Sequence, residues 1–245
     1  MTEFLRVVRF CSVSCESSYD ESVSNRTLAN SSEHNRKRVT GSNPCIAHHL
    51  LPRMREIAGI LSDAIRGSVE LTKSLDAVAD RVGRTVDTVA GALAAGQKLL
   101  ICGNGGSAAD AAHLATEFVV RFVRNRPPYP AICLSNDAGT LTAAGNDYGF
   151  EQVFARQVSA FGRPGDVLIC LSTSGNSRNV QRALEEGRTR GLTTVAFLGR
   201  DGGETRGAAD IELVVRSEST ARIQEAHMLL LHVLCEAVEE RLGDK

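Results

Sequence analysis

The stretch KLLICGNGGSAADAAHLATEF, residues 98–118, limits the possible folds more than any other part of this 245-residue chain. The apolar run at 99–102 is short and continuous, which is typical of a parallel β-strand covered on both faces. The glycines that follow allow a sharp turn, and Ser107 is placed to N-cap a helix that begins with alanines. A strand, a glycine turn and a helix N-terminus together form an anion site, so the pattern predicts a phosphate or the polar end of a sugar as ligand.

His113 and Glu117 lie four residues apart on the predicted helix, so their side chains stack on one face. An imidazole and a carboxylate at this spacing can ligate a divalent metal such as zinc, or act as an acid/base pair on a substrate. The same spacing also occurs in solvated surface pairs. The two residues lie about 9 and 15 Å along the helix from Ser107, a distance that a phosphosugar can span. We therefore take both as candidate site residues.

A second hydroxyl-rich turn follows an apolar strand predicted at 166–171 and precedes a helix predicted at about 178–190. Hydroxyls and backbone N–H groups at a helix N-terminus suit a phosphate monoester without a lysine or a metal. The turn lacks the Gly-Lys-Ser/Thr ending of a nucleotide P-loop. A plain serine-rich cap is the alternative, although the turn has more hydroxyls than capping requires. The hydroxyl-bearing residues are Ser172, Thr173, Ser174 and Ser177.

A last helix is predicted from Thr220 to about Leu242, and it carries Gln224, His227 and His232. Gln224 and His232 differ by eight residues, which is about 80° in azimuth and 12 Å in rise. Helix geometry therefore does not decide which of these side chains faces His113 and Glu117.

The apolar runs alternate with helices, which predicts an α/β fold: a three-layer αβα sandwich with a five-stranded, doubly wound parallel sheet and ligands at the carboxyl ends of the strands. Two amphipathic helices, from Met54 to about Gly67 and from about Leu71 to Gly96, precede the first strand. Such a pair either packs against another subunit or covers its own sheet. The predicted strands are 99–102, 131–134, 166–171, 193–198 and 211–215.

Between the second and third strands, a short helix is predicted at 137–144 and another at 150–161. The glycine-flanked loop between them, 145–149, carries Asn146 and Asp147, which offer an amide and a carboxylate to a ligand.

Composition bounds the remaining possibilities. Ser, Asn, Arg and Glu dominate the N-terminal segment, so we expect residues 1–53 to be a disordered extension and residues 54–245 to form one domain. A net charge of −1 does not predict nucleic acid or an anionic membrane as partner. The chain has neither the roughly 18 consecutive apolar residues of a membrane helix nor the apolar core of a secretory signal, so we expect a cytoplasmic protein. Four cysteines lie inside apolar runs and are interpreted as structural: Cys102, Cys133, Cys170 and Cys235.

Four motifs, CGNGGSAADAAHLATEF, GNDYGF, LSTSGNSRNV and TARIQEAHMLLLHVL, together resemble a sugar isomerase (SIS) domain of the phosphoheptose isomerase type. The resemblance covers about Met54 to Leu242. It implies conversion of D-sedoheptulose 7-phosphate to D-glycero-D-manno-heptose 7-phosphate in activated-heptose biosynthesis. It also implies one Zn²⁺ per subunit and a homotetramer.

Carried over residue by residue, the resemblance assigns roles. Glu117 would move a proton between C1 and C2, and His232 would act as acid/base on the oxygens. Glu117 cannot be a tight metal ligand and a free base at once, so either it loosens from the metal during turnover or the metal is partly structural. The implied metal ligands are His113, Glu117, Gln224 and His232. The implied phosphate ligands are Ser172, Thr173, Ser174 and Ser177. The implied sugar contacts are Asn104, Gly105, Gly106, Asn146 and Asp147, and Ser107, Glu117 and Gln224 complete the substrate set.

The alternative to an isomerase belongs to another functional class. A close relative of this family is a regulatory tetramer that binds the bacterial replication initiator and catalyses no isomerisation. It lacks the carboxylate matching Glu117 and the histidine matching His232, and this chain has both, which favours the enzyme. An isomerase of another phosphosugar is a further alternative. The N-terminal segment resembles neither protein.

Overall fold

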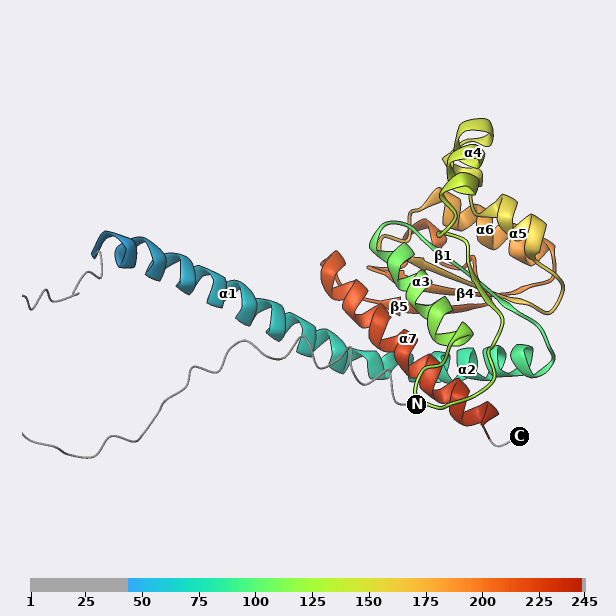
Figure 1. Cartoon of the computed structure of the whole chain (residues 1–245), viewed down its shortest axis with the longest axis horizontal. Helices are drawn as coiled ribbons and strands as arrows, with labels where there is room; N and C mark the ends of the chain where they lie inside the picture. The colour runs from blue at the N-terminus through green and yellow to red at the C-terminus, as the bar shows by residue number, and fades with distance from the viewer. Residues whose placement is uncertain (1–43, 244–245) are drawn as a thin grey trace, which may run out of the picture. The chain divides into compact units, whose positions relative to one another are not determined.

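The computed structural model describes residues 44–243, with side chains described from Glu56 onward; the predicted disorder of residues 1–43 lies outside this part. A five-stranded sheet, all of whose strand pairs are parallel, has the order β2-β1-β3-β4-β5 (Figure 1). This confirms the predicted fold class. The strands are β1 (Leu99–Gly103), β2 (Ala131–Cys133), β3 (Val167–Ser172), β4 (Thr193–Gly199) and β5 (Ile211–Val215).

Helices cover both faces of the sheet (Figure 1). Successive strand residues point to opposite faces, so Leu99 and Ile101 join one core and Leu100 and Cys102 join the other. Every residue of β1 and β3 is buried, which explains why both read as continuous apolar runs. On the first face lie α2 (Ala79–Ala94), α3 (Gly106–Val119) and α7 (Thr220–Leu242). On the second lie α4 (Ala138–Tyr148), α5 (Ala155–Phe161) and α6 (Arg178–Thr189).

The predicted structural cysteines lie in these cores. Cys102 and Cys170 pack against each other between β1 and β3, with their sulfur atoms 3.4 Å apart. Burial raises the pKa of the Cys235 thiol to about 12, so this residue is an inert core thiol. Cys133 is half-buried.

The N-terminal helices differ from the prediction. Helix α1 (Pro44–Ser74) begins ten residues before Met54 and continues through Gly67, and a short 3₁₀ helix, η2 (Leu75–Val78), joins it to α2. Proline is favoured at the first helical position, and one interior glycine costs only about 1 kcal/mol, too little to end a long helix. The helix therefore crosses the predicted boundary between extension and domain.

Three local predictions are also corrected. Asn146 and Asp147 lie in the last turn of α4 rather than in a loop, because the helix continues to Gly149, whose φ of 86° ends it. The helix predicted at 150–161 is divided into η3 (Phe150–Gln152) and α5. The N-cap of α3 is Gly105, with φ 57°, and Ser107 is buried inside the first turn.

No helix within residues 44–243 combines the length and the apolar character needed to cross a membrane.

Candidate active site

The two predicted anion turns lie side by side at the carboxyl ends of the adjacent strands β1 and β3. The side-chain amides of Asn104, after β1, and Asn179, in the first turn of α6, donate to each other in two hydrogen bonds of 2.8 Å. The Ser135 hydroxyl, after β2, donates to the carbonyl of Gly103 at 2.9 Å. These polar contacts fix the positions of both turns.

Two of the three glycines in the glycine turn, Gly103 and Gly106, have no room for a side chain. A Cβ on Gly103 would lie 2.6 Å from the carbonyl oxygen of Ser107. A Cβ on Gly106 would lie 1.9 Å from Nε2 of Gln224, which places the amide of this α7 residue against the N-terminus of α3. The glycines therefore allow close packing as well as ligand approach.

The hydroxyl turn uses some of its oxygens internally. The Gly175 N–H donates to Ser172 Oγ at 3.1 Å, and the Asn176 N–H donates to Ser174 Oγ at 3.1 Å. Ser177 occupies the N-cap of α6, but its side chain makes no cap hydrogen bond. Its hydroxyl instead forms a 3.3 Å hydrogen bond with that of Ser172, and it lies at the helix N-terminus, where it can also contact a ligand.

Another part of the fold holds the remainder of this turn in place. The carbonyl of Gly175 accepts from the backbone N–H of Thr205 at 2.8 Å. The φ of Gly175 is 67°, a conformation that favours glycine. The half-buried Thr173 lies close to β4, because a Cβ on Gly199 would be 2.2 Å from the Thr173 carbonyl oxygen.

The titratable groups converge where α3 crosses α7. His113 Nε2 lies 2.9 Å from His232 Nε2 and 3.5 Å from Glu117 Oε1. The His113 side chain is 40% exposed and that of Glu117 is 19% exposed, so a ligand can reach both. The ring of Phe122 packs against His232 with its centroid 5.4 Å away. A carboxylate and two imidazoles thus meet at one point, and they can exchange protons with a substrate there.

The structure distinguishes the two histidines of α7. His227 is fully buried, its ring faces Phe197 edge-on, and neither ring nitrogen has a hydrogen-bond partner among the described residues. Burial lowers the pKa of His227 to about 4. His227 is therefore a neutral core residue, and His232 is the histidine that joins His113 and Glu117.

Stability at acid pH should depend on His227. Its pKa falls from 6.5 to about 4 on folding, so the unfolded chain binds a proton that the folded chain does not. Between pH 6.5 and 4 this should lower the free energy of unfolding by up to about 3 kcal/mol as the pH falls. In His227→Leu that loss should be absent, as measured by urea unfolding from pH 7.5 to 4. A constant difference between the two proteins over this range would contradict the assignment.

The other predicted site residues are not all brought together. Asn146 and Asp147 are exposed at the end of α4, where the amide of Asn146 donates to Asp147 Oδ1 at 2.8 Å. Within the described residues no hydrogen bond joins either of them to the two turns, and none joins Gln224 to His113, Glu117 or His232.

The residue types of His113, Glu117 and His232 suit zinc, because imidazole nitrogens and carboxylates are usual zinc ligands. The distance between the two imidazole nitrogens is nevertheless that of a hydrogen bond and not that of two ligands sharing a metal. Two nitrogens bound tetrahedrally to one zinc would lie about 3.3 Å apart, whereas His113 and His232 are closer, at 2.9 Å. From Glu56 to Gly243, where side chains are described, no group of three or more His, Cys, Asp and Glu side chains is arranged to hold a metal ion.

Sequence reasoning missed Ser135 and Asn179, which support the turns. Each occupies a position that could have been noticed: Ser135 follows the second strand, and Asn179 lies in the first turn of the helix after the hydroxyl turn. Neither is part of a recognisable spacing, so only the packing of the strands identifies them.

Comparison with known proteins agrees with this geometry. Residues 66–199 match the SIS domain family. The chain is 52% identical over 165 residues to a phosphoheptose isomerase of Geobacter sulfurreducens, an alignment that covers 67% of this chain and 87% of that protein. It is 47% identical to that of Halorhodospira halophila, covering 76% and 94%. The chain belongs to the phosphoheptose isomerase family of SIS-domain proteins.

Solved members of the phosphoheptose isomerase family have the same fold. The structure from Francisella tularensis superimposes with a TM-score of 0.71 at 36% identity, covering 77% of this chain and 98% of that one. The structure from Neisseria gonorrhoeae gives 0.68 at 39% identity, covering 76% and 98%. The family model, residues 66–199, includes both anion turns and the strands from β1 to β4.

Proposed function

We propose that this chain is an aldose–ketose isomerase that interconverts D-sedoheptulose 7-phosphate and D-glycero-D-manno-heptose 7-phosphate, a step toward activated heptose. The observation that carries the proposal is the convergence of His113, Glu117 and His232 in a member of the phosphoheptose isomerase family. The hydroxyl turn at the N-terminus of α6 lies at the same edge of the sheet. A phosphosugar with its phosphate in that turn would extend its carbonyl end toward the three titratable groups.

The proposed reaction moves one proton between adjacent carbons through an ene-diol. Glu117 is the proposed base, because a carboxylate can take the proton from one carbon and return it to the other. His232 is the proposed acid/base on the two oxygens, because an imidazole can both donate and accept near neutral pH. The partial burial of Glu117 limits exchange of the transferred proton with water.

The phosphate is proposed to bind at the hydroxyl turn. The hydroxyl of Ser177, which makes no cap hydrogen bond, and the N-terminal N–H groups of α6 favour a dianion without a lysine. Ser174 and Thr173 are half-buried beside it and complete the proposed contacts. Asn104, Gly105 and Gly106 at the neighbouring turn are proposed to contact the sugar hydroxyls.

We also propose that His113, Glu117 and His232 hold one Zn²⁺ per subunit, with Gln224 as the fourth ligand suggested by the family resemblance. A bound zinc would act as a Lewis acid toward the substrate oxygens. The proposal requires the two histidine rings to separate from their 2.9 Å contact and the Gln224 amide to leave Gly106.

Metal analysis tests this assignment. His232→Ala removes a proposed ligand and should lower the zinc content of the purified full chain well below that of the wild type. His227→Ala serves as the control, since His227 faces Phe197 in the core and should affect stability without removing zinc. Loss of zinc in His227→Ala and its retention in His232→Ala would overturn the assignment on α7.

The experiment that tests the isomerase proposal is an assay of the wild type on sedoheptulose 7-phosphate with zinc supplied, following formation of the aldose. Turnover supports the proposal. Absence of turnover on this substrate, with turnover of another ketose phosphate, would favour the broader phosphosugar isomerase alternative. No turnover at all would favour the regulatory alternative that binds the replication initiator.

A homotetramer is proposed as the assembly. The apolar side chains Ile57, Ile60, Leu61, Ile65 and Val69 recur at helical spacing along α1 and are between 46% and 64% exposed. An exposed stripe of this kind is typical of an interface between subunits. A cytoplasmic location, expected from the sequence, stays a prediction.

A further inference from the structure

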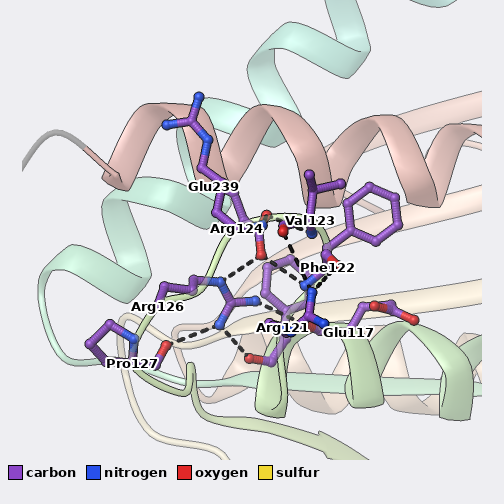
Figure 2. A network of polar contacts seen from close by, with 9 residues as sticks. Glu117, Arg121, Phe122, Val123, Arg124, Arg126, Pro127 and Glu239 are labelled. Atoms are coloured by element: carbon purple, nitrogen blue, oxygen red, sulfur yellow. Dashed lines mark hydrogen bonds and ion pairs between the residues drawn. The ribbon is translucent and has the colours of Figure 1, made fainter. Parts of the chain in front are cut away.

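A buried ion pair connects the two helices that carry the titratable groups. Arg126 lies in the strap that follows α3, residues 120–127, and Glu239 lies on α7 (Figure 2). Arg126 Nε donates to Glu239 Oε1 at 2.8 Å, and the side chains are 7% and 2% exposed. Burying two charges costs desolvation free energy, which is offset only where hydrogen bonds satisfy both groups. The hydrogen bonds of Arg126 and Glu239 therefore show which segments the pair holds in place.

Glu239 holds the strap. Its carboxylate accepts from three consecutive backbone N–H groups, those of Phe122 at 2.8 Å, Val123 at 3.0 Å and Arg124 at 2.8 Å. Burial by itself would raise the pKa of Glu239, but these three donors and Arg126 outweigh burial and lower it, so the group stays ionised. The carboxylate thereby fixes Phe122, whose ring packs against His232.

Arg126 holds the end of α3. Its Nη2 donates to the carbonyl of Glu117 at 2.8 Å, and its Nη1 donates to the carbonyl of Phe118 at 2.9 Å. These are carbonyls of the last turn of the helix, which lack helical partners. The guanidinium also stacks over the ring of Tyr129, 4.0 Å from its centroid. The guanidinium of Arg126 therefore links the backbone of Glu117, the proposed base, to Glu239 on α7.

We propose that Arg126 and Glu239 form a positioning clamp that sets the register of α3 against α7, and with it the separations among His113, Glu117 and His232. Glu239 lies seven residues, or two helical turns, after His232 on the same face of α7. Arg126 bonds the carbonyl of Glu117 itself. The clamp touches neither substrate nor titratable side chains and acts only through their placement. The inference rests on the proposed isomerase function.

The test compares two clamp variants with a matched control. Glu239→Gln keeps the shape but loses the charge, and Arg126→Lys keeps a cation but cannot bond both helix carbonyls. Asp166→Asn is the control, because Asp166 is a buried carboxylate that likewise pairs with a cation, Lys98, and accepts from the backbone N–H groups of Lys98 and Arg163. It lies at the amino end of β3, opposite the carboxyl end that carries the hydroxyl turn.

We expect all three variants of the full chain to melt at lower temperature than the wild type. In Glu239→Gln and Arg126→Lys, kcat should fall about 10- to 100-fold with KM within about threefold, because misplacement of reacting groups costs rate rather than binding. In Asp166→Asn, kcat should stay at the wild-type value. A clamp variant with wild-type kcat, or an Asp166→Asn whose kcat falls as far, would overturn the inference.

Hydrogen exchange separates failure of the clamp from failure of the proposed function. The amides of Phe122, Val123 and Arg124 and of the last turn of α3 should exchange faster in Glu239→Gln than in wild type, and at the wild-type rate in Asp166→Asn. An inactive wild type would remove the isomerase proposal, yet this exchange pattern would still report the coupling of α3 to α7. An active wild type with unchanged exchange in Glu239→Gln would overturn the clamp alone.

Discussion

Glu117→Gln should abolish isomerisation while leaving the fold and substrate binding nearly intact. The amide keeps the size and hydrogen-bonding reach of the carboxylate but cannot accept a proton from carbon. We expect kcat to fall by about 10² to 10⁴, the usual contribution of a positioned base. Binding of the sugar phosphate should change less than about tenfold, or about 1.4 kcal/mol. Steady-state kinetics on sedoheptulose 7-phosphate and calorimetric binding measure the two quantities.

The control for this variant is Glu236→Gln. Glu236 is exposed on α7 one turn beyond His232, and the substitution removes the same charge near the site without touching the cluster. Its kcat should equal that of the wild type. If Glu117→Gln kept more than about a tenth of the wild-type kcat, Glu117 would not be the base, and His232 would become the candidate for both proton transfers.

The double variant Ser174→Ala/Ser177→Ala should raise KM sharply with little loss of stability. Each hydrogen bond from a hydroxyl to a phosphate dianion contributes about 1.5–3 kcal/mol, so loss of both should raise KM by at least about 100-fold. We leave Ser172 unchanged, because it is buried and its Oγ accepts from the Gly175 N–H, so its loss would also disturb the turn. Initial-rate kinetics over a wide substrate range give KM.

Thr189→Ala is the matched control for the phosphate experiment. Thr189 lies at the other end of α6, where its hydroxyl donates to the carbonyl of Glu185 at 2.9 Å, so the substitution removes a hydroxyl from the same helix. Its KM should be unchanged. An unchanged KM in the double variant would place the phosphate elsewhere, with the glycine turn at Gly103–Ser107 as the next candidate.

Several local expectations failed for reasons of context. The sequence pattern predicts that the first helix ends near Gly67, but the cost of one glycine is small beside the turns of helix on either side. The sequence also predicts a loop at Asn146 and Asp147, because both residue types favour turns. The helix instead continues to Gly149, where a positive φ ends it. Short-range preferences of this kind are weak, and neighbouring residues override them.

The sequence by itself determined the αβα architecture, since continuous apolar strands must be covered by helices on both faces. It also determined the two anion turns, since glycines and hydroxyls between a strand and a helix N-terminus form such a turn from neighbouring residues alone. It also paired His113 with Glu117, because four residues make one helical turn. Helix periodicity left His227 and His232 open, because it fixes angles within α7 but not which face packs against α3, and the family resemblance implied His232. The tertiary structure supplied the physical reason, since His232 contacts His113 and His227 faces Phe197 in the core. The clamp of Arg126 and Glu239 is likewise visible only in the tertiary structure. Its partners are 113 residues apart, and no spacing along the chain encodes a contact that exists only once two helices cross.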